Sequence, residues 1–175
     1  MRDVLRTLGV FVAVCCCLAA TASATTLQPL TGEELTDTAE TIVVGRCSAV
    51  ESQWFGRSLM TLVTVTVDES WKGEAASELT VVIPGGVDND RPIPVAVTYP
   101  GAPVITPGED ILLFLTPSVG IEGHSIVGFS QGVFPIIKDE GAKAQVVQTR
   151  KHRQGALDLD EVRSRIQSYL EAAKP

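Results

Sequence analysis

The sequence has few of the residues that stabilise a small domain by cross-links or large aromatic side chains. Its four cysteines include three within the first 24 residues, so the remainder of the chain holds only Cys47 and cannot form an internal disulfide. Aromatic residues make up only 5% of the chain, so aliphatic side chains must supply most of the core. A domain of about 150 residues can do this without disulfides, because folding hides roughly two-thirds of its unfolded surface.

Motifs that hold metals or cofactors are also missing. The only two histidines, His124 and His152, lie far from each other and from Cys47, so no zinc-type spacing such as H-E-x-x-H or C-x-x-C occurs. There is no P-loop and no dinucleotide fingerprint, and no helix is expected after Gly85-Gly86 to bind phosphate. We therefore expect no metal and no cofactor, and we set aside kinase, NTPase and dehydrogenase functions.

Positive charge is scarce as well. The chain has 14 Lys and Arg against 21 Asp and Glu, a net charge of −7, which becomes −8 if Arg2, Asp3 and Arg6 are removed with residues 1–24. Nucleic-acid binding needs a basic face that releases counterions from phosphates, and the only basic cluster lies at 150–153. We therefore expect no nucleic-acid partner.

The first 24 residues have the pattern of a secretory signal peptide. Arg2 and Arg6 give a positive start, an apolar run from Leu8 to Ala20 follows, and Ala22-Ser23-Ala24 is a small-x-small cleavage site. The apolar run is shorter than the roughly 18 residues that a spanning helix needs, which disfavours a membrane anchor. We predict cleavage after Ala24, no stable membrane span afterwards, and a secreted or periplasmic single β-rich domain at 25–175.

Apolar and polar residues alternate through the middle of the chain, as they do in half-buried strands. Leu59, Val63 and Val65 share one parity and Met60 and Thr64 share the other. Strands are predicted at 41–50, 59–67, 78–83, 93–98, 111–115, 125–129, 133–138 and 144–148, with a hairpin turn at 52–57 and a proline-rich loop at 85–107.

Two predicted strands and two predicted helices have further features. Ile111–Leu115 is apolar on both parities, which indicates a central strand, and Gly45 marks a bulge or bend. The T-x-x-E capping box at Thr31 predicts a short helix over 32–39, and Asp158 as N-cap predicts an amphipathic helix over 158–173. The expected fold is therefore mainly β, a small antiparallel OB-like barrel or sandwich with a short N-terminal and a C-terminal amphipathic helix.

A possible nucleophile stands in Gly128-Phe129-Ser130-Gln131-Gly132, which matches the G-x-S-x-G pattern of serine hydrolases. Asp139 and His152 follow Ser130 and could complete a triad. However, the residues after Gly132 read as a strand with a proline where the hydrolase elbow begins a helix. A turn between strands is the preferred interpretation, and a small serine hydrolase using Ser130 is the alternative.

Candidate binding residues are aromatic or acidic and lie in or near predicted loops. Trp54, Phe55 and Trp71 flank the first hairpin, and they are expected either to close a barrel end or to form a contact surface. Tyr99 belongs to the proline-rich loop. Asp88 and Asp90 begin like a calcium loop, but the glycine and glutamate that such a loop requires do not follow, so a solvated turn is preferred.

Several short motifs carry a resemblance. The segments at 39–46, 65–67, 71–73, 84–86, 101–103, 107–109, 114–115 and 128–132 resemble exported bacterial proteins of unknown function. The VVG strand followed by a WKG strand end also looks like netrin-type or tissue-inhibitor-type domains, which implies an OB-like barrel with terminal helices. In the inhibitors an N-terminal cysteine chelates the target's metal, whereas the expected mature terminus here is Thr25, so the resemblance carries no inhibitory residue to this chain.

These observations favour an exported, non-enzymatic module that binds a protein or a cell-envelope component. The candidate recognition element is the proline-rich loop at 85–107. A structural envelope protein is a further alternative, which a disulfide between molecules through Cys47 would favour. We otherwise expect Cys47 to be a small buried apolar side chain.

Overall fold

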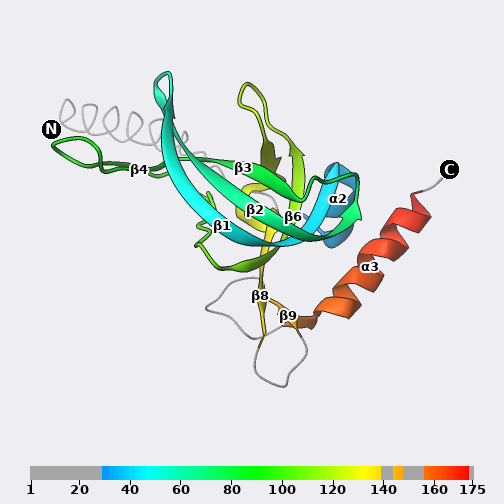
Figure 1. Cartoon of the computed structure of the whole chain (residues 1–175). Coiled ribbons are helices and arrows are strands. Elements are labelled where there is room, and N and C mark those ends of the chain that lie inside the picture. Colours follow the sequence, from blue (N-terminus) through cyan, green and yellow to red (C-terminus); the bar gives the residue numbers. More distant parts are fainter. Residues whose placement is uncertain (1–28, 139–143, 148–155, 174–175) are drawn as a thin grey trace, which may run out of the picture.

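A computed structural model describes residues 29–138, 144–147 and 156–173 (Figure 1). The predicted signal peptide, Asp139 and His152 lie outside these residues. The elements in chain order are α2 (Gly32–Thr38), β1 (Thr41–Phe55), β2 (Ser58–Lys72), β3 (Glu78–Pro84), β4 (Gly86–Asp88), β5 (Val95–Val97), β6 (Asp110–Pro117), β7 (His124–Ile126), the 3-10 helix η2 (Phe129–Gly132), β8 (Val133–Ile137), β9 (Gln145–Val146), β10 (Leu157–Asp158) and α3 (Leu159–Ala172).

The large sheet closes on itself. Its order is β1-β2-β3-β7-β6-β8-β9-β10, and a further pairing of β1 with β6 joins β1, β2, β3, β7 and β6 into a ring. The mainly β fold with a short N-terminal helix and a C-terminal helix is therefore confirmed, and five strands is also the number in an OB barrel. One detail differs from the antiparallel expectation, because β3 pairs with β7 in parallel at Val81 and His124, which makes the sheet mixed.

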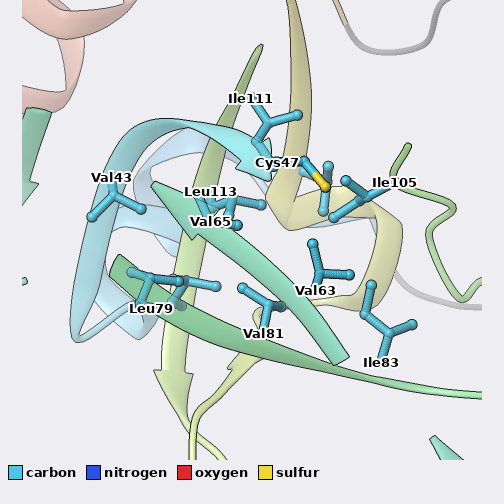
Figure 2. Packing of buried hydrophobic residues seen from close by; sticks show 12 residues of the cluster. Val43, Cys47, Val63, Val65, Leu79, Val81, Ile83, Ile105, Ile111 and Leu113 are labelled. Carbon is cyan, nitrogen blue, oxygen red and sulfur yellow. The ribbon is translucent and has the colours of Figure 1, made fainter. Parts of the chain in front are cut away.

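Two apolar clusters lie on opposite faces of β1 and β6. The first is mostly inside the ring and contains Val43, Cys47, Val65 and Leu113 (Figure 2). The second lies between the outer face of these strands and the helices α2 and α3, and its members are Leu35, Ala39, Ile42, Val44, Leu112, Phe114, Val127, Ile136, Val146 and Ile166. Burial of residues 111–115 on both faces confirms the central strand that the sequence predicted.

The predicted helices are present with their expected caps. Thr31 Oγ1 accepts from the Glu34 amide at 3.2 Å, and Glu34 Oε2 accepts from the Thr31 amide at 2.7 Å, which completes the capping box of α2. The Asp158 side chain caps α3 by accepting from the Asp160 amide at 2.9 Å. Figure 1 shows α2 and α3 on the side of the molecule away from β4.

The first hairpin is longer than expected. Residues 52–57 were predicted as a turn, but β1 continues to Phe55 and the turn is only Gly56 and Arg57. Gly56 has φ of +62°, a left-handed conformation that glycine adopts without strain, so two residues suffice to reverse the chain. Trp54 and Phe55 therefore lie on a strand rather than in a loop.

Part of the predicted loop at 85–107 is also regular structure. Gly86–Asp88 forms β4 and pairs with β5 in a separate two-stranded sheet, which we call the arm. The predicted strand at 93–98 is thus present as Val95–Val97, and its partner β4 lies within the predicted loop. Figure 1 shows the arm extending from β3 beside the β1–β2 hairpin.

Candidate functional site

The arm and the first hairpin enclose a hollow, which we call the arm groove. Its volume is about 750 Å³, within the range usual for ligand sites. Its lining includes the β1 residues Val50, Glu51 and Ser52, Thr61 of β2, the end of β3, the arm, and the return segment Ala102–Ile105. The groove thus brings together segments far apart in the sequence.

The arm is attached to the hairpin by short polar contacts. Ser52 Oγ accepts from the Val87 amide at 3.1 Å, and Thr61 Oγ1 donates to the Gly85 carbonyl at 2.8 Å. A Cβ at Gly86 would lie 2.5 Å from Ser52 Oγ and 2.7 Å from Thr61 Oγ1, so only glycine allows β4 to approach this closely. These contacts fix one wall of the groove.

Trp54, Asp88 and Arg91 form a second attachment at the outer end of the arm. Trp54 Nε1 donates to Asp88 Oδ2 at 2.6 Å, and Arg91 Nε donates to the same oxygen at 2.8 Å. The Arg91 guanidinium also lies over the Trp54 ring, 4.8 Å from its centroid. The hydrogen bond from Trp54 lowers the pKa of Asp88 below its ordinary value, and the Asp90 amide and Arg91 act in the same direction against the effect of burial.

Two further predicted binding residues line the arm groove. Tyr99 is 43% exposed, and the Asp90 side chain lies at the surface. The Asp90 amide donates to Asp88 Oδ1 at 3.1 Å, which forms the tight turn that the sequence predicted here. No group of three or more His, Cys, Asp or Glu side chains suited to a metal ion occurs among the residues that the structure describes.

Trp71 and Phe55 lie elsewhere. Trp71 packs against the second apolar cluster, its Nε1 donates to Glu69 Oε2 at 2.9 Å, and Arg163 of α3 covers its ring at 5.3 Å. Phe55 lines a different hollow of about 540 Å³ together with His124. Of the predicted binding residues, the structure therefore gathers Trp54, Asp88, Asp90 and Tyr99 and separates Trp71 and Phe55 from them.

Exposed apolar side chains mark the surroundings of the arm groove. The described residues include six large hydrophobic side chains that are exposed, and Val87, Tyr99 and Val104 line the groove. Two others, Val119 and Phe129, line a neighbouring hollow of about 340 Å³ that shares Ile83, Pro84 and Pro103 with it, and the sixth, Ile93, lies in the β4–β5 connection. Solitary exposed hydrophobics need no explanation, but a cluster of them indicates an interaction surface.

Sequence reasoning missed Val87, Arg91 and Val104 as members of this surface. Val104 lies next to Pro103 in a segment without regular structure, and its side chain is 91% exposed, which no periodic pattern could reveal. A usable signal was present in Arg91, which stands three residues after Asp88 and could have been predicted to pair with it. The contact of Asp88 and Arg91 with Trp54 on β1 could not be inferred from the spacing of these residues in the sequence.

Ser130 lies outside the arm groove lining, in η2. Phe129 before it has φ of +57°, a strained conformation for a residue other than glycine, and the Ser130 amide donates to the Gly101 carbonyl at 3.1 Å. Strand β8 begins directly after Gly132, as the sequence predicted, where a hydrolase elbow would continue into a helix. The suggested partners Asp139 and His152 lie outside the described residues.

Cys47 is buried in the first apolar cluster. Its side chain is 1% exposed, and its Sγ lies 3.6 Å from the Ala49 carbonyl oxygen. Burial raises the pKa of the thiol, and the nearby Glu109 carboxylate raises it further. Both effects oppose formation of the reactive thiolate.

The chain was compared with known proteins in three ways. No family model, no curated protein and no solved structure matches it. Among residues 29–138, 144–147 and 156–173, no helix has the length and apolar character needed to cross a membrane. The arguments about function therefore rest on the geometry of the surface described above.

Proposed function

We propose that this protein is an exported binding module whose partner is a protein or a cell-envelope component. The observation that supports this proposal is the gathering of exposed apolar side chains around two adjoining hollows. Such clusters on soluble domains are typical of interaction surfaces. The signal-peptide pattern at 1–24 supports export, with the mature chain secreted or periplasmic.

The arm groove has the composition of a recognition site. It combines apolar side chains with carboxylates and exposed backbone, and polar contacts to Ser52, Thr61 and Trp54 hold its arm in place. A surface that is organised before binding loses less conformational entropy when the partner docks. This favours binding as the function of the groove.

The proposal is tested by capture of partners with residues 25–175 from the exported proteins of the source organism. Val104→Glu places a charge on a side chain that is 91% exposed and leaves the core untouched. Gln167→Glu adds the same charge to an exposed position of α3, away from the groove, and is the matched control. A partner that is captured by the parent and by Gln167→Glu but lost with Val104→Glu supports the proposal.

The opposite pattern contradicts it. If the folded parent captures no component, or if Val104→Glu captures the same components as the control, the apolar cluster is not the binding surface. Export is tested separately by N-terminal sequencing of the protein recovered outside the cytoplasm, which should begin at Thr25. A chain recovered with residues 1–24 attached would contradict the cleavage prediction.

A further inference from the structure

We infer that the arm groove binds an extended, basic polypeptide segment, which pairs as an added strand with the free edge of β1 from Val50 to Trp54. This inference rests on the proposed function, because it names the class of partner for the same surface. It is carried by the direction of the β1 backbone groups, by the shape of the groove and by its charge.

The backbone direction follows from one hydrogen bond and the strand register. Leu59 lies opposite Trp54 in the register. The Leu59 carbonyl accepts from the Gly85 amide at 2.9 Å, so this carbonyl points away from β1. In an antiparallel pair, opposite residues that do not bond each other direct their N–H and C=O groups outward on both strands. The N–H and C=O groups of Trp54 therefore point away from β2.

The alternation continues along the hairpin. The register runs without a shift from Ala49 to Phe55, so Ser52 and Val50 direct their backbone groups to the same side as Trp54. On that side β6 pairs with β1 only over Thr41–Arg46, and the contact ends where Cys47 bonds with Gly108 and Glu109. In the part of the chain that the structure describes, no strand pairs with β1 on that side beyond this point.

This free edge lies at the arm groove. Val50 and Ser52 line the hollow, and the exposed side chains of Val87, Tyr99 and Val104 surround it. An unpaired edge is a template for an incoming strand, whose backbone supplies affinity while alternate side chains enter neighbouring pockets. Backbone groups and apolar contacts are therefore both available to an extended segment.

Charge indicates which segment fits. The groove is lined by the carboxylates of Glu51, Asp88 and Asp90 and by no Lys or Arg among the described residues, and the whole chain carries a net charge of −7. Arg91 pairs with Asp88, while Glu51 and Asp90 are exposed. Complementary charge speeds association and selects partners, so a segment with apolar residues and at least one Lys or Arg is favoured.

The test uses displayed random octapeptides selected against residues 25–175, followed by synthesis of the selected peptides. We expect Lys or Arg together with β-branched residues to be enriched. Methylation of backbone nitrogens should weaken binding by about fivefold or more at every second peptide position and leave the intervening positions unchanged, because only alternate N–H groups face β1. Amide signals of Val50, Ser52 and Trp54 should shift on binding in NMR spectra.

Charge variants give a second readout. Glu51→Gln and Asp90→Asn should each weaken the selected peptides by about two- to fivefold, whereas Glu171→Gln on α3 should not. Absence of the alternating methylation pattern, amide shifts confined to residues away from β1, or failure to select any peptide would overturn the inference. Dimerisation that protects the Val50 and Ser52 amides would also overturn it, because the occupant would then be a second copy of this chain.

The two proposals fail in different ways. Capture that depends on Val104, combined with peptides that do not pair with β1, would leave the binding function standing and remove the strand-addition inference. If neither Val104-dependent capture nor peptide pairing with β1 is observed, the proposed binding function is contradicted as well.

Discussion

Trp54 on β1 and Asp88 on β4 are joined by a hydrogen bond of 2.6 Å, although 34 positions separate them in the chain. Each residue was a candidate binding residue on its own, the first as an aromatic beside a hairpin and the second as part of an acidic turn. The structure shows that they attach the arm to the first hairpin, and that Asp88 lines the arm groove.

The first prediction concerns this bond. Trp54→Phe removes the indole donor and should raise the pKa of Asp88 toward its ordinary value of 3.8, as followed by the carboxyl carbon signal in an NMR titration. Because the pKa of folded Asp88 is lowered, its stabilising contribution is present above pH 3.8 and is lost as the pH falls through the lowered value. Trp71→Phe is the control, since its indole bonds Glu69 and should leave the Asp88 titration unchanged.

The second prediction concerns the packing of α3. Ile166 is 3% exposed in the second apolar cluster, so Ile166→Ala should lower the free energy of unfolding by about 2–5 kcal/mol in chemical denaturation. Gln167→Ala, at the next and exposed position, should change it by less than about 0.5 kcal/mol. Equal effects of the two substitutions would show that α3 does not pack as described.

The third prediction concerns Cys47. Because the thiol is buried and its pKa is raised, we expect alkylation by iodoacetamide at pH 8 to be slow in the native protein and fast in denaturant. The purified chain should run as a monomer on non-reducing gels. A disulfide-linked dimer would instead favour the alternative of a structural envelope protein, and rapid labelling of the native protein would contradict the burial of Cys47.

The fourth prediction separates binding from hydrolysis. If the protein is a binding module, it should show no turnover of p-nitrophenyl esters above that of the Ser130→Ala variant, and this variant should retain partner capture. Ser125→Ala is a matched control for the loss of one hydroxyl group nearby. Ester turnover that Ser130→Ala abolishes while the circular dichroism spectrum is unchanged would support the hydrolase alternative.

The strands and helices could be predicted where the cause is local. Alternating apolar residues predicted β2, and a continuous apolar run predicted β6. Capping residues predicted the starts of α2 and α3. The bend expected at Gly45 is present as a register shift between Val44 and Gly45. These features depend on neighbouring residues, which a sequence displays directly.

The arm groove depends on contacts between distant segments, and these could not be predicted. Strand β4 of the arm could not be predicted, because it contains only Gly86, Val87 and Asp88, too few residues for an alternating pattern. Likewise, the free edge of β1 follows from where β6 stops pairing, which no single segment specifies. The sequence therefore indicated the candidate residues but not which of them share a surface.

The sharing of β1 and β6 between the two apolar clusters has a consequence for unfolding. Val43 contributes to the first cluster while its neighbours Ile42 and Val44 contribute to the second, so separation of β1 from β6 would expose both clusters together. Heating should accordingly produce one cooperative heat-absorption peak whose calorimetric and van't Hoff enthalpies agree. A substitution that weakens the packing of α3 should then also lower the stability of the barrel interior, because β1 and β6 contribute side chains to both apolar clusters.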